Sequence, residues 1–172
     1  ITRYAQAFRE LLARPEDEAR GEEFLGRLRE VCEAFDGSRI EREDRIPDEY
    51  LAALRDVGAF GMKIPREYGG LGLTMSAYGK ALVLAGSAHP SIGALLSAHQ
   101  SIGVPEPVKL VGTSEQKQAF LPRCAAGAIS AFLLTEPDVG SDPARMASTA
   151  TPTPDGTAYV LDGLKLWTTN GV

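Results

Sequence analysis

The chain has 172 residues, 44% of them hydrophobic, and a formal net charge of −5. This composition allows a packed core without disulfides, and it offers no basic face of the kind that binds a nucleic-acid backbone. The two cysteines, Cys32 and Cys124, are far apart and form neither a disulfide framework nor a metal motif, which favours a reducing, cytoplasmic location.

No secretory leader opens the chain, and no apolar run approaches the length of a membrane span. The first residue is an isoleucine, so we expect the natural N-terminus to lie further upstream. Residues 1–49 carry 14 acidic and 9 basic side chains, which account for the whole net charge. This density indicates helices with a solvated, charged face.

Helical spacing of apolar residues predicts amphipathic helices over 3–13 and 21–35. The segment 37–47 then links to a short helix, for which Pro47 suits the first turn and Gly58 marks the end. A connection rich in glycine and proline follows.

The segment 72–105 has a single charged residue, Lys80, and Pro90 divides it into expected helices over 75–88 and 91–102. Thr74 is a suitable N-cap for the first of them. Helices that are apolar or small on every side are typical of buried positions, so we expect both to be buried.

Glycines recur in this segment, at Gly79, Gly86, Gly93 and Gly103. The simpler interpretation is close helix packing, because glycine keeps a helix surface slim. The alternative is one wall of a deep pocket, in which the missing side chains leave room for a ligand tail. The sequence alone favours close packing and leaves the pocket open.

Two more helices are expected before the pattern changes, and Thr113 or Ser114 caps the second. After Gly127 the apolar run 128–134 has the character of a strand, and an alternating pattern with Pro-Asp-Gly and Asp-Gly turns follows it. The order predicts an α+β fold: an N-terminal helical domain over residues 1–127 and the first three or four strands of a β domain over 128–172, which we expect to continue past the last residue.

Two short stretches have side chains suited to binding a flat heterocycle. The end of the predicted strand can present backbone groups and a hydroxyl, a Gly-Ser pair can approach an anionic group, and the only tryptophan can cover a ring beside two threonines. The simpler interpretation is that these are turns and that the tryptophan is part of the core. The candidate residues are Phe132, Leu133, Leu134, Thr135, Gly140, Ser141, Trp167, Thr168 and Thr169.

The remaining polar candidates indicate structure more than chemistry. Glu136 precedes Pro137 in a tight turn, which favours a structural carboxylate over a catalytic one. His89 and His99 lie near no cysteine or acidic cluster, so they make a poor metal site and suit helix contacts better. The sequence has no nucleophile elbow and no glycine-rich phosphate loop. We therefore assign no catalytic residue and no metal ligand.

The motifs KIPREYGGLGL, AHQSIG, LVGTSEQKQAFLP, AFLLTEPDVGSD and LDGLKLWTTNG occur in this order. Over residues 50–172 the sequence strongly resembles the acyl-CoA dehydrogenase family, and the TEP-x-x-GSD block is highly specific. The resemblance implies a helical domain, a middle β domain and a C-terminal helical domain that this chain lacks. It also implies a homodimer or homotetramer.

By position, the resemblance implies that residues 132–135 bind the pyrimidine edge of FAD and that Trp167 packs on its isoalloxazine. Thr168 and Thr169 would lie on the N5 side of the flavin, and Ser141 would contact the CoA portion of the substrate. The family oxidises fatty acyl-CoA to trans-2-enoyl-CoA in β-oxidation and passes electrons to an electron-transfer flavoprotein. Its catalytic glutamate lies in the C-terminal domain, so we expect these 172 residues alone to be inactive.

Several alternatives remain. An acyl-CoA oxidase uses the same flavin half-reaction but returns electrons to oxygen, and a non-catalytic binding or assembly module could keep the fold without the chemistry. The motifs are closest to the very-long-chain branch, and an open pocket at Gly86 and Gly93 would suit a long acyl tail.

Overall fold

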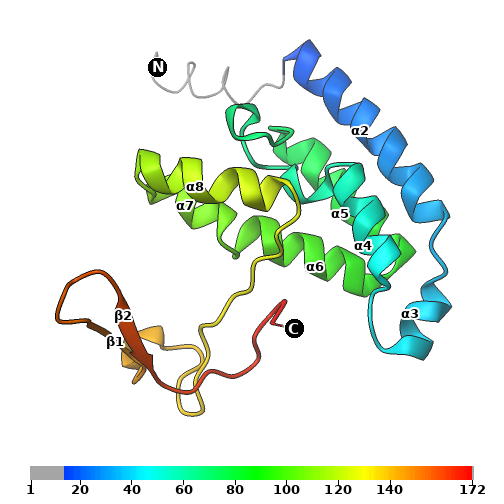
Figure 1. Ribbon diagram of the computed structural model, residues 1–172. Helices are drawn as coiled ribbons and strands as arrows, with labels where there is room; N and C mark the ends of the chain where they lie inside the picture. The colour runs from blue at the N-terminus through cyan, green and yellow to red at the C-terminus, as the bar shows by residue number, and fades with distance from the viewer. Residues whose placement is uncertain (1–13, 172) are drawn as a thin grey trace, which may run out of the picture. The chain divides into compact units, whose positions relative to one another are not determined.

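The computed structural model describes residues 14–171, and the predicted helix over 3–13 lies outside them. The chain forms two compact units that divide between Ser130 and Ala131. The first unit is helical and the second carries the strands, which confirms the predicted α+β class (Figure 1). The boundary after Gly127, as the limit of a natural domain, stays a prediction.

The first unit is built from helices joined by short connections. In chain order they are α2 (Pro15–Glu33), α3 (Gly37–Glu43), α4 (Asp48–Asp56), the 3-10 turns η1 (Ala59–Gly61) and η2 (Arg66–Tyr68), α5 (Met75–Ala88), α6 (Pro90–Ser101), α7 (Pro105–Val111) and α8 (Ser114–Ala125). Helices α7 and α8 lie side by side in Figure 1. No helix in the described part of the chain is both long and apolar enough to cross a membrane.

Side-chain caps fix where several helices begin. The hydroxyl of Thr74 accepts a hydrogen bond from the amide of Ala77 (3.2 Å), which confirms the predicted cap of α5. Of the two candidates for α8, Thr113 is the cap, and it forms a reciprocal capping box with Gln116.

The N-terminal helices differ from the prediction in two respects. Helix α2 begins at Pro15, well before residue 21, because proline and three acidic residues suit a first turn. The segment predicted as a link contains α3, so that prediction is wrong. The carboxylate of Asp36 starts this helix by accepting a hydrogen bond from the amide of Ser38 (3.0 Å).

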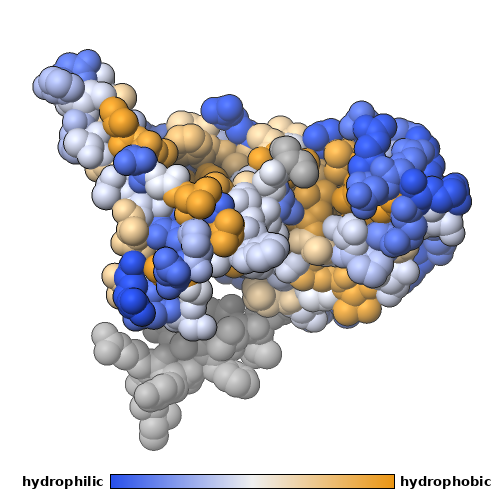
Figure 2. Space-filling model, turned by 90° about the horizontal axis from the view of Figure 1, so that it is seen from below, coloured by the Kyte–Doolittle hydropathy of each residue, from blue (hydrophilic) through white to orange (hydrophobic). Residues whose placement is uncertain are grey.

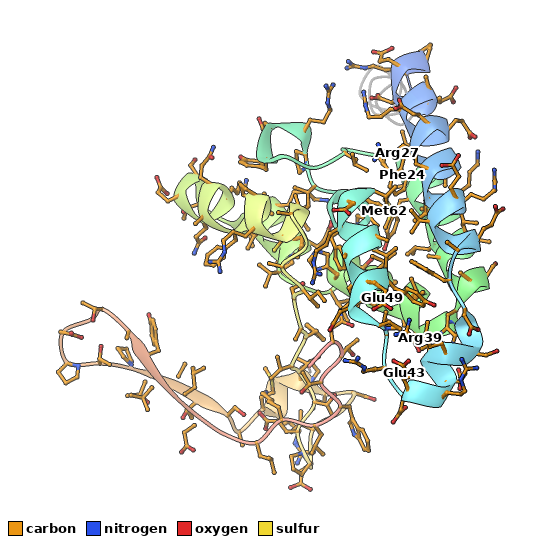
Figure 3. All side chains as sticks on the ribbon, turned by 45° about the vertical axis from the view of Figure 1, so that its right-hand side comes forward. Phe24, Arg27, Arg39, Glu43, Glu49 and Met62 are labelled. Carbon is orange, nitrogen blue, oxygen red and sulfur yellow. The ribbon has the colours of Figure 1, made fainter. Side chains whose placement is uncertain are left out.

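The main core lies where α2, α4, η1, α5 and α6 converge. Figure 3 labels two buried members of this core, Phe24 of α2 and Met62, which follows η1. A smaller apolar cluster joins the C-terminal half of α8 to Ile64. The main core includes Phe24, Leu25, Leu28, Tyr50, Leu54, Phe60, Met62, Tyr78, Ile92 and Leu96, and the smaller cluster consists of Ile64, Leu121, Cys124 and Ala125.

The charged face of the N-terminal region is solvated, as its composition predicts. Arg39 of α3 pairs with Glu43 one turn later (2.6 Å) and also with Glu49 at the start of α4 (Figure 3). These pairs are partly exposed, so each contributes little stability, of the order of 0–1 kcal/mol.

Helix α5 is not buried on every side, which corrects the prediction. Val83 is 71% exposed and Met75 is also exposed, and apolar residues interrupt the hydrophilic surface shown in Figure 2. The glycines of this weakly charged segment indicate contact between α5 and α6. A Cβ on Gly93 of α6 would lie 2.9 Å from the Cα of Gly86 in α5, so this glycine serves close helix packing. The pocket interpretation of Gly93 is therefore wrong.

The second unit has a small antiparallel hairpin. Strand β1 (Thr149–Pro152) pairs with β2 (Tyr159–Asp162), and the 3-10 turn η3 (Pro143–Arg145) precedes them. Among the described residues these are the only two strands, where three or four were expected. The predicted strand over 128–134 is also wrong, since only an isolated bridge at Phe132 forms there.

Candidate functional site

The two candidate stretches of the second unit lie against each other. The amide of Phe132 donates to the carbonyl of Thr169 (3.0 Å), and the amide of Leu166 donates to the carbonyl of Thr135 (2.8 Å). The two bonds run in antiparallel order, and the Phe132–Thr169 pair forms an isolated antiparallel bridge. Two candidate stretches more than 30 residues apart in sequence are thus brought together.

The backbone of Trp167 explains why this pairing does not extend into a strand. Its φ is +56°, in the left-handed region, and Asn170 has a φ of +59°. Residues other than glycine rarely adopt this conformation, which interrupts the extended geometry that a ladder needs. The run 128–134 therefore lacks a regular partner, and alternation of side chains could not reveal this.

The indole of Trp167 is 84% exposed, so the interpretation of this residue as core is wrong. A large apolar ring on an exposed, left-handed backbone is costly in isolation, because burial of such a ring is normally a major source of stability. Thr168 is half-buried beside it, and Thr169 is exposed. The ring is available to pack on a flat partner.

One backbone edge of residues 132–135 remains open. The pairing uses the amide of Phe132 and the carbonyl of Thr135, and the carbonyl of Leu134 accepts from the Nζ of Lys165 (3.1 Å). Within the described residues, both backbone groups of Leu133, the amides of Leu134 and Thr135 and the Thr135 hydroxyl have no hydrogen-bond partner. This edge offers both donors and acceptors to a ligand.

Glu136 has the structural role that its place in the sequence predicts. It is 5% exposed, and its amide and carbonyl bond those of Val139 to close the tight turn. Its carboxylate accepts from the amides of Ala147 (2.7 Å) and Ser148 (3.0 Å) and from the Nζ of Lys165 (2.8 Å). The ammonium of Lys165, with the Ser148 and Ala147 donors, lowers the pKa of Glu136 to about 2.

Lys165 is not among the candidate residues expected from the sequence. Its signal was available, because it is the only basic residue after Arg145 and a carboxylate buried in a turn needs a cation or several donors. Its side chain is 21% exposed, and it spans from the carbonyl of Leu134 to the carboxylate of Glu136.

The Gly-Ser pair is not bonded to the stretch that contains Trp167. Gly140 and Ser141 follow the tight turn and are both exposed, and a Cβ on Gly140 would meet open space. Among the described residues, neither makes a hydrogen bond to the 165–169 segment. The pair is thus accessible to a ligand but is not fixed beside Trp167.

The two histidines serve helix contacts, as their surroundings in the sequence predict. His89 caps α6 by accepting from the amide of Ser91 (3.2 Å), and its Nε2 lies 2.7 Å from the carboxylate of Glu41. His99 is fully buried, and its Nδ1 lies 2.9 Å from the hydroxyl of Ser130. Burial lowers the pKa of His99, so the neutral ring is favoured.

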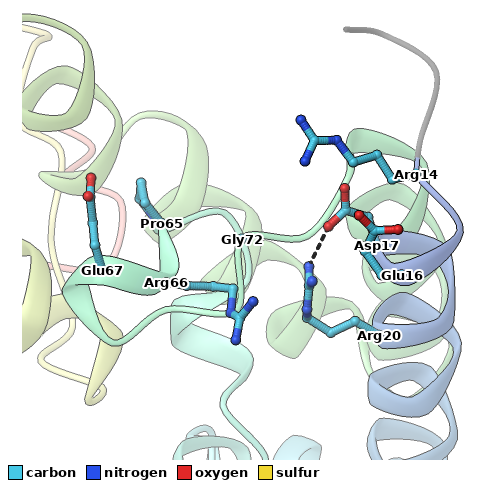
Figure 4. Close-up of a pocket in the computed structure, with 8 residues that line it drawn as sticks. All are labelled: Arg14, Glu16, Asp17, Arg20, Pro65, Arg66, Glu67 and Gly72. Carbon is cyan, nitrogen blue, oxygen red and sulfur yellow. Dashed lines mark hydrogen bonds and ion pairs between the residues drawn. The ribbon is translucent and has the colours of Figure 1, made fainter. Parts of the chain in front are cut away.

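Two surface hollows lie elsewhere on the described part of the chain, and none of the candidate site residues lines either of them. The first, of about 450 Å³, lies in the helical unit and carries three arginines and three acidic residues, and Arg20 is paired with Asp17 (2.8 Å) (Figure 4). This balanced charge selects neither an anion nor a cation, so we assign no ligand to it. The second, of about 270 Å³, lies beside the Glu136 turn in the other unit.

Comparisons with known proteins agree on one family. The profile of the acyl-CoA dehydrogenase N-terminal domain matches residues 21–128. The chain is 68% identical over 156 residues to the probable acyl-CoA dehydrogenase FadE10 of Mycobacterium tuberculosis, covering 91% of this chain and 24% of that protein. It is 40% identical over 140 residues to the mitochondrial very long-chain specific acyl-CoA dehydrogenase of Bos taurus, covering 81% and 21%.

A solved structure shows the same fold. The acyl-CoA dehydrogenase of Bacillus anthracis, complexed with FAD, superposes with a TM-score of 0.70 at 29% identity, covering 92% of this chain and 27% of that one. This chain therefore spans about a quarter of the length of the curated relatives it matches.

Proposed function

Because this chain belongs to the acyl-CoA dehydrogenase family, we propose that its parent protein catalyses FAD-dependent α,β-dehydrogenation of fatty acyl-CoA thioesters to trans-2-enoyl-CoA. The chain would contribute the N-terminal helical domain and one wall of the flavin site. The observation that carries the proposal is that the exposed Trp167 ring lies on a segment bonded, through Leu166 and Thr169, to the partly unpaired backbone of residues 132–135.

The open edge suits the pyrimidine end of a flavin. That ring end alternates hydrogen-bond donors and acceptors in one plane, and the edge offers the amide and carbonyl of Leu133, the amide of Thr135 and the Thr135 hydroxyl. Bonds to Lys165 and Leu166 hold the opposite side of the same segment, so the edge keeps its direction when a ligand arrives.

Trp167 suits the ring system of the same cofactor. Packing on the isoalloxazine would bury an indole that is otherwise exposed, and stacked aromatic pairs gain about 0.5–1.5 kcal/mol beyond the area they bury. Thr168 and Thr169 follow directly and would reach the N5 side. When bound, FAD would supply the hydride acceptor, while these residues bind and orient it.

The substrate assignment rests on the exposed Gly-Ser pair and on the relatives. Ser141 would donate a hydrogen bond to the CoA portion of the thioester, which an exposed hydroxyl can reach. Similarity to a very long-chain specific enzyme supports a long acyl chain. The electron acceptor would be an electron-transfer flavoprotein, and the assembly a homodimer or homotetramer.

The test is the visible spectrum of the full-length parent protein under anaerobic conditions, before and after addition of a long-chain acyl-CoA. Loss of the oxidised flavin band is expected, and oxygen uptake with the same substrate would identify an oxidase instead. A band that persists with long, medium and branched acyl-CoA would refute dehydrogenation. A colourless protein that takes up no added FAD would favour the non-catalytic binding module.

A further inference from the structure

We infer that Lys165 and Glu136 form a positioning pair that fixes how the two flavin-binding segments of the second unit face each other; this inference rests on the proposed function. Neither side chain belongs to the open edge or to the exposed ring. Each acts through its neighbours, Lys165 through Trp167 and Leu134, and Glu136 through Thr135.

The pair lies at the junction of three segments. The Nζ of Lys165 donates to the Leu134 carbonyl (3.1 Å) and to the Glu136 carboxylate (2.8 Å), so one ammonium binds both ends of the 134–136 peptide. The same carboxylate accepts the amides of Ala147 and Ser148, which lead into β1. The segments 134–136, 147–148 and 165 are thus held at one charged point.

Backbone pairing alone leaves the register weakly fixed. Among the backbone bonds of the described residues, those of Phe132 with Thr169 and of Leu166 with Thr135 join the two segments, and the left-handed Trp167 lies between Leu166 and Thr169. Two isolated bonds do not resist a one-residue slip, which would turn alternate side chains to the opposite face. Lys165 is adjacent to Leu166, so its bonds to Leu134 and Glu136 exclude that slip.

The electrostatics make this point costly to disturb. Glu136 is buried as a carboxylate, and removing its cation leaves a buried charge with two amide donors only. The ammonium also occupies the Leu134 carbonyl, while both backbone groups of Leu133 and the amide of Thr135 stay open to the cofactor. A lysine in a surface ion pair would neither neutralise a buried carboxylate nor bind this backbone carbonyl.

The experiment measures FAD affinity and thermal midpoint of the full-length apo protein for Lys165→Met, with Lys80→Met as the matched control. Lys80 forms an ion pair of similar length with Glu22 (2.7 Å), but on the exposed surface of the helical unit. We expect Lys165→Met to weaken FAD binding about tenfold or more, since small displacements of binding groups have large effects, and Lys80→Met to leave it unchanged.

A double variant separates positioning from stability. Glu136→Gln with Lys165→Met removes both charges, so it should recover much of the thermal midpoint, while FAD affinity stays low because Leu134 still lacks its donor. Lys165→Met should also add little to Trp167→Ala, as expected for residues that act through each other. FAD affinity that recovers with the midpoint, or that Lys165→Met leaves intact, would overturn the inference.

Amide hydrogen exchange keeps the inference distinct from the proposed function. A parent protein that takes up no FAD would refute the flavin site but not the register. In that case Lys165→Met should still speed exchange at the amides of Phe132 and Leu166, which make the two register bonds. Unchanged exchange at both amides would refute the positioning role, whatever the protein binds.

Discussion

Gly93 of α6 packs directly on Gly86 of α5, because a Cβ added to Gly93 would lie 2.9 Å from the Gly86 Cα. Helix backbones can approach this closely only where the side chain is missing. We therefore expect Gly93→Ala to destabilise the chain by about 1–3 kcal/mol, as overpacking typically does. Urea unfolding followed by far-UV circular dichroism measures this loss.

Gly79 supplies the control, since it lies in α5 and a Cβ there would meet no atom within contact distance. Alanine has the higher helix propensity, so Gly79→Ala should be neutral or stabilising by up to about 1 kcal/mol. Equal losses in both variants would mean that glycine flexibility, and not the helix contact, matters at these positions.

Gln100 joins α6 to the turn that follows α4. Its amide nitrogen donates to the carbonyls of Ala59 (3.3 Å) and Phe60, and its oxygen accepts from the amide of Lys63 (3.0 Å). The side chain is fully buried, so Gln100→Leu would keep the volume but leave these backbone groups unpaired, at a cost of roughly 2–4 kcal/mol. Gln118→Leu, at an exposed position of α8, should cost less than about 0.5 kcal/mol. Similar midpoints for the two variants in thermal unfolding would contradict this role.

The helical unit could be predicted well because its signals are local. Thr74 and Thr113 cap their helices, and the apolar spacing of α2 gives its buried face. The start of α3 was missed because the capping bond of Asp36 is a single short-range contact inside a highly charged stretch. The exposed face of α5 could not be inferred from a composition that suits burial equally well.

The two candidate stretches were found from their residue types, and the binding roles of those residues stay a prediction. The structure brings the two stretches together through the Phe132–Thr169 and Thr135–Leu166 bonds. The left-handed Trp167 depends on the surrounding loop, so the expected strand did not form. Lys165 was overlooked, although it is the only basic residue after Arg145, because its partner Glu136 is 29 residues away in the sequence.

His99 should make the stability of the helical unit depend on pH. Burial lowers its folded pKa, while the unfolded ring titrates near its ordinary value of about 6.5, so the unfolded state binds the proton more readily. The contribution of His99 to stability is therefore fully present above about pH 6.5 and decreases as the pH falls below that value. Asparagine can keep an acceptor near the Ser130 amide, and His99→Asn should flatten the dependence between about pH 7 and pH 5. If the urea midpoints of both proteins change equally with pH, groups other than His99 cause the pH dependence.

Glu136 should make the second unit sensitive at lower pH. Lys165 and the Ser148 and Ala147 donors lower its folded pKa to about 2 from an ordinary value of 4.5, so the folded state binds its proton less readily than the unfolded state. The resulting stabilisation is present above about pH 4.5 and is lost as the pH falls toward about 2. Glu136→Gln lacks it at every pH, so the two proteins should converge in stability across this interval.

Trp167 provides the measurement, because it is the only tryptophan of the chain and lies in the same unit. Urea unfolding is followed by its fluorescence at several pH values from about 6 to about 2. The measurement gives the difference in free energy of unfolding between the unsubstituted protein and Glu136→Gln. A difference that narrows below about pH 4.5 supports a carboxylate held ionised by Lys165. A difference that stays constant down to the lowest pH would show that the two side chains differ in packing and not in charge.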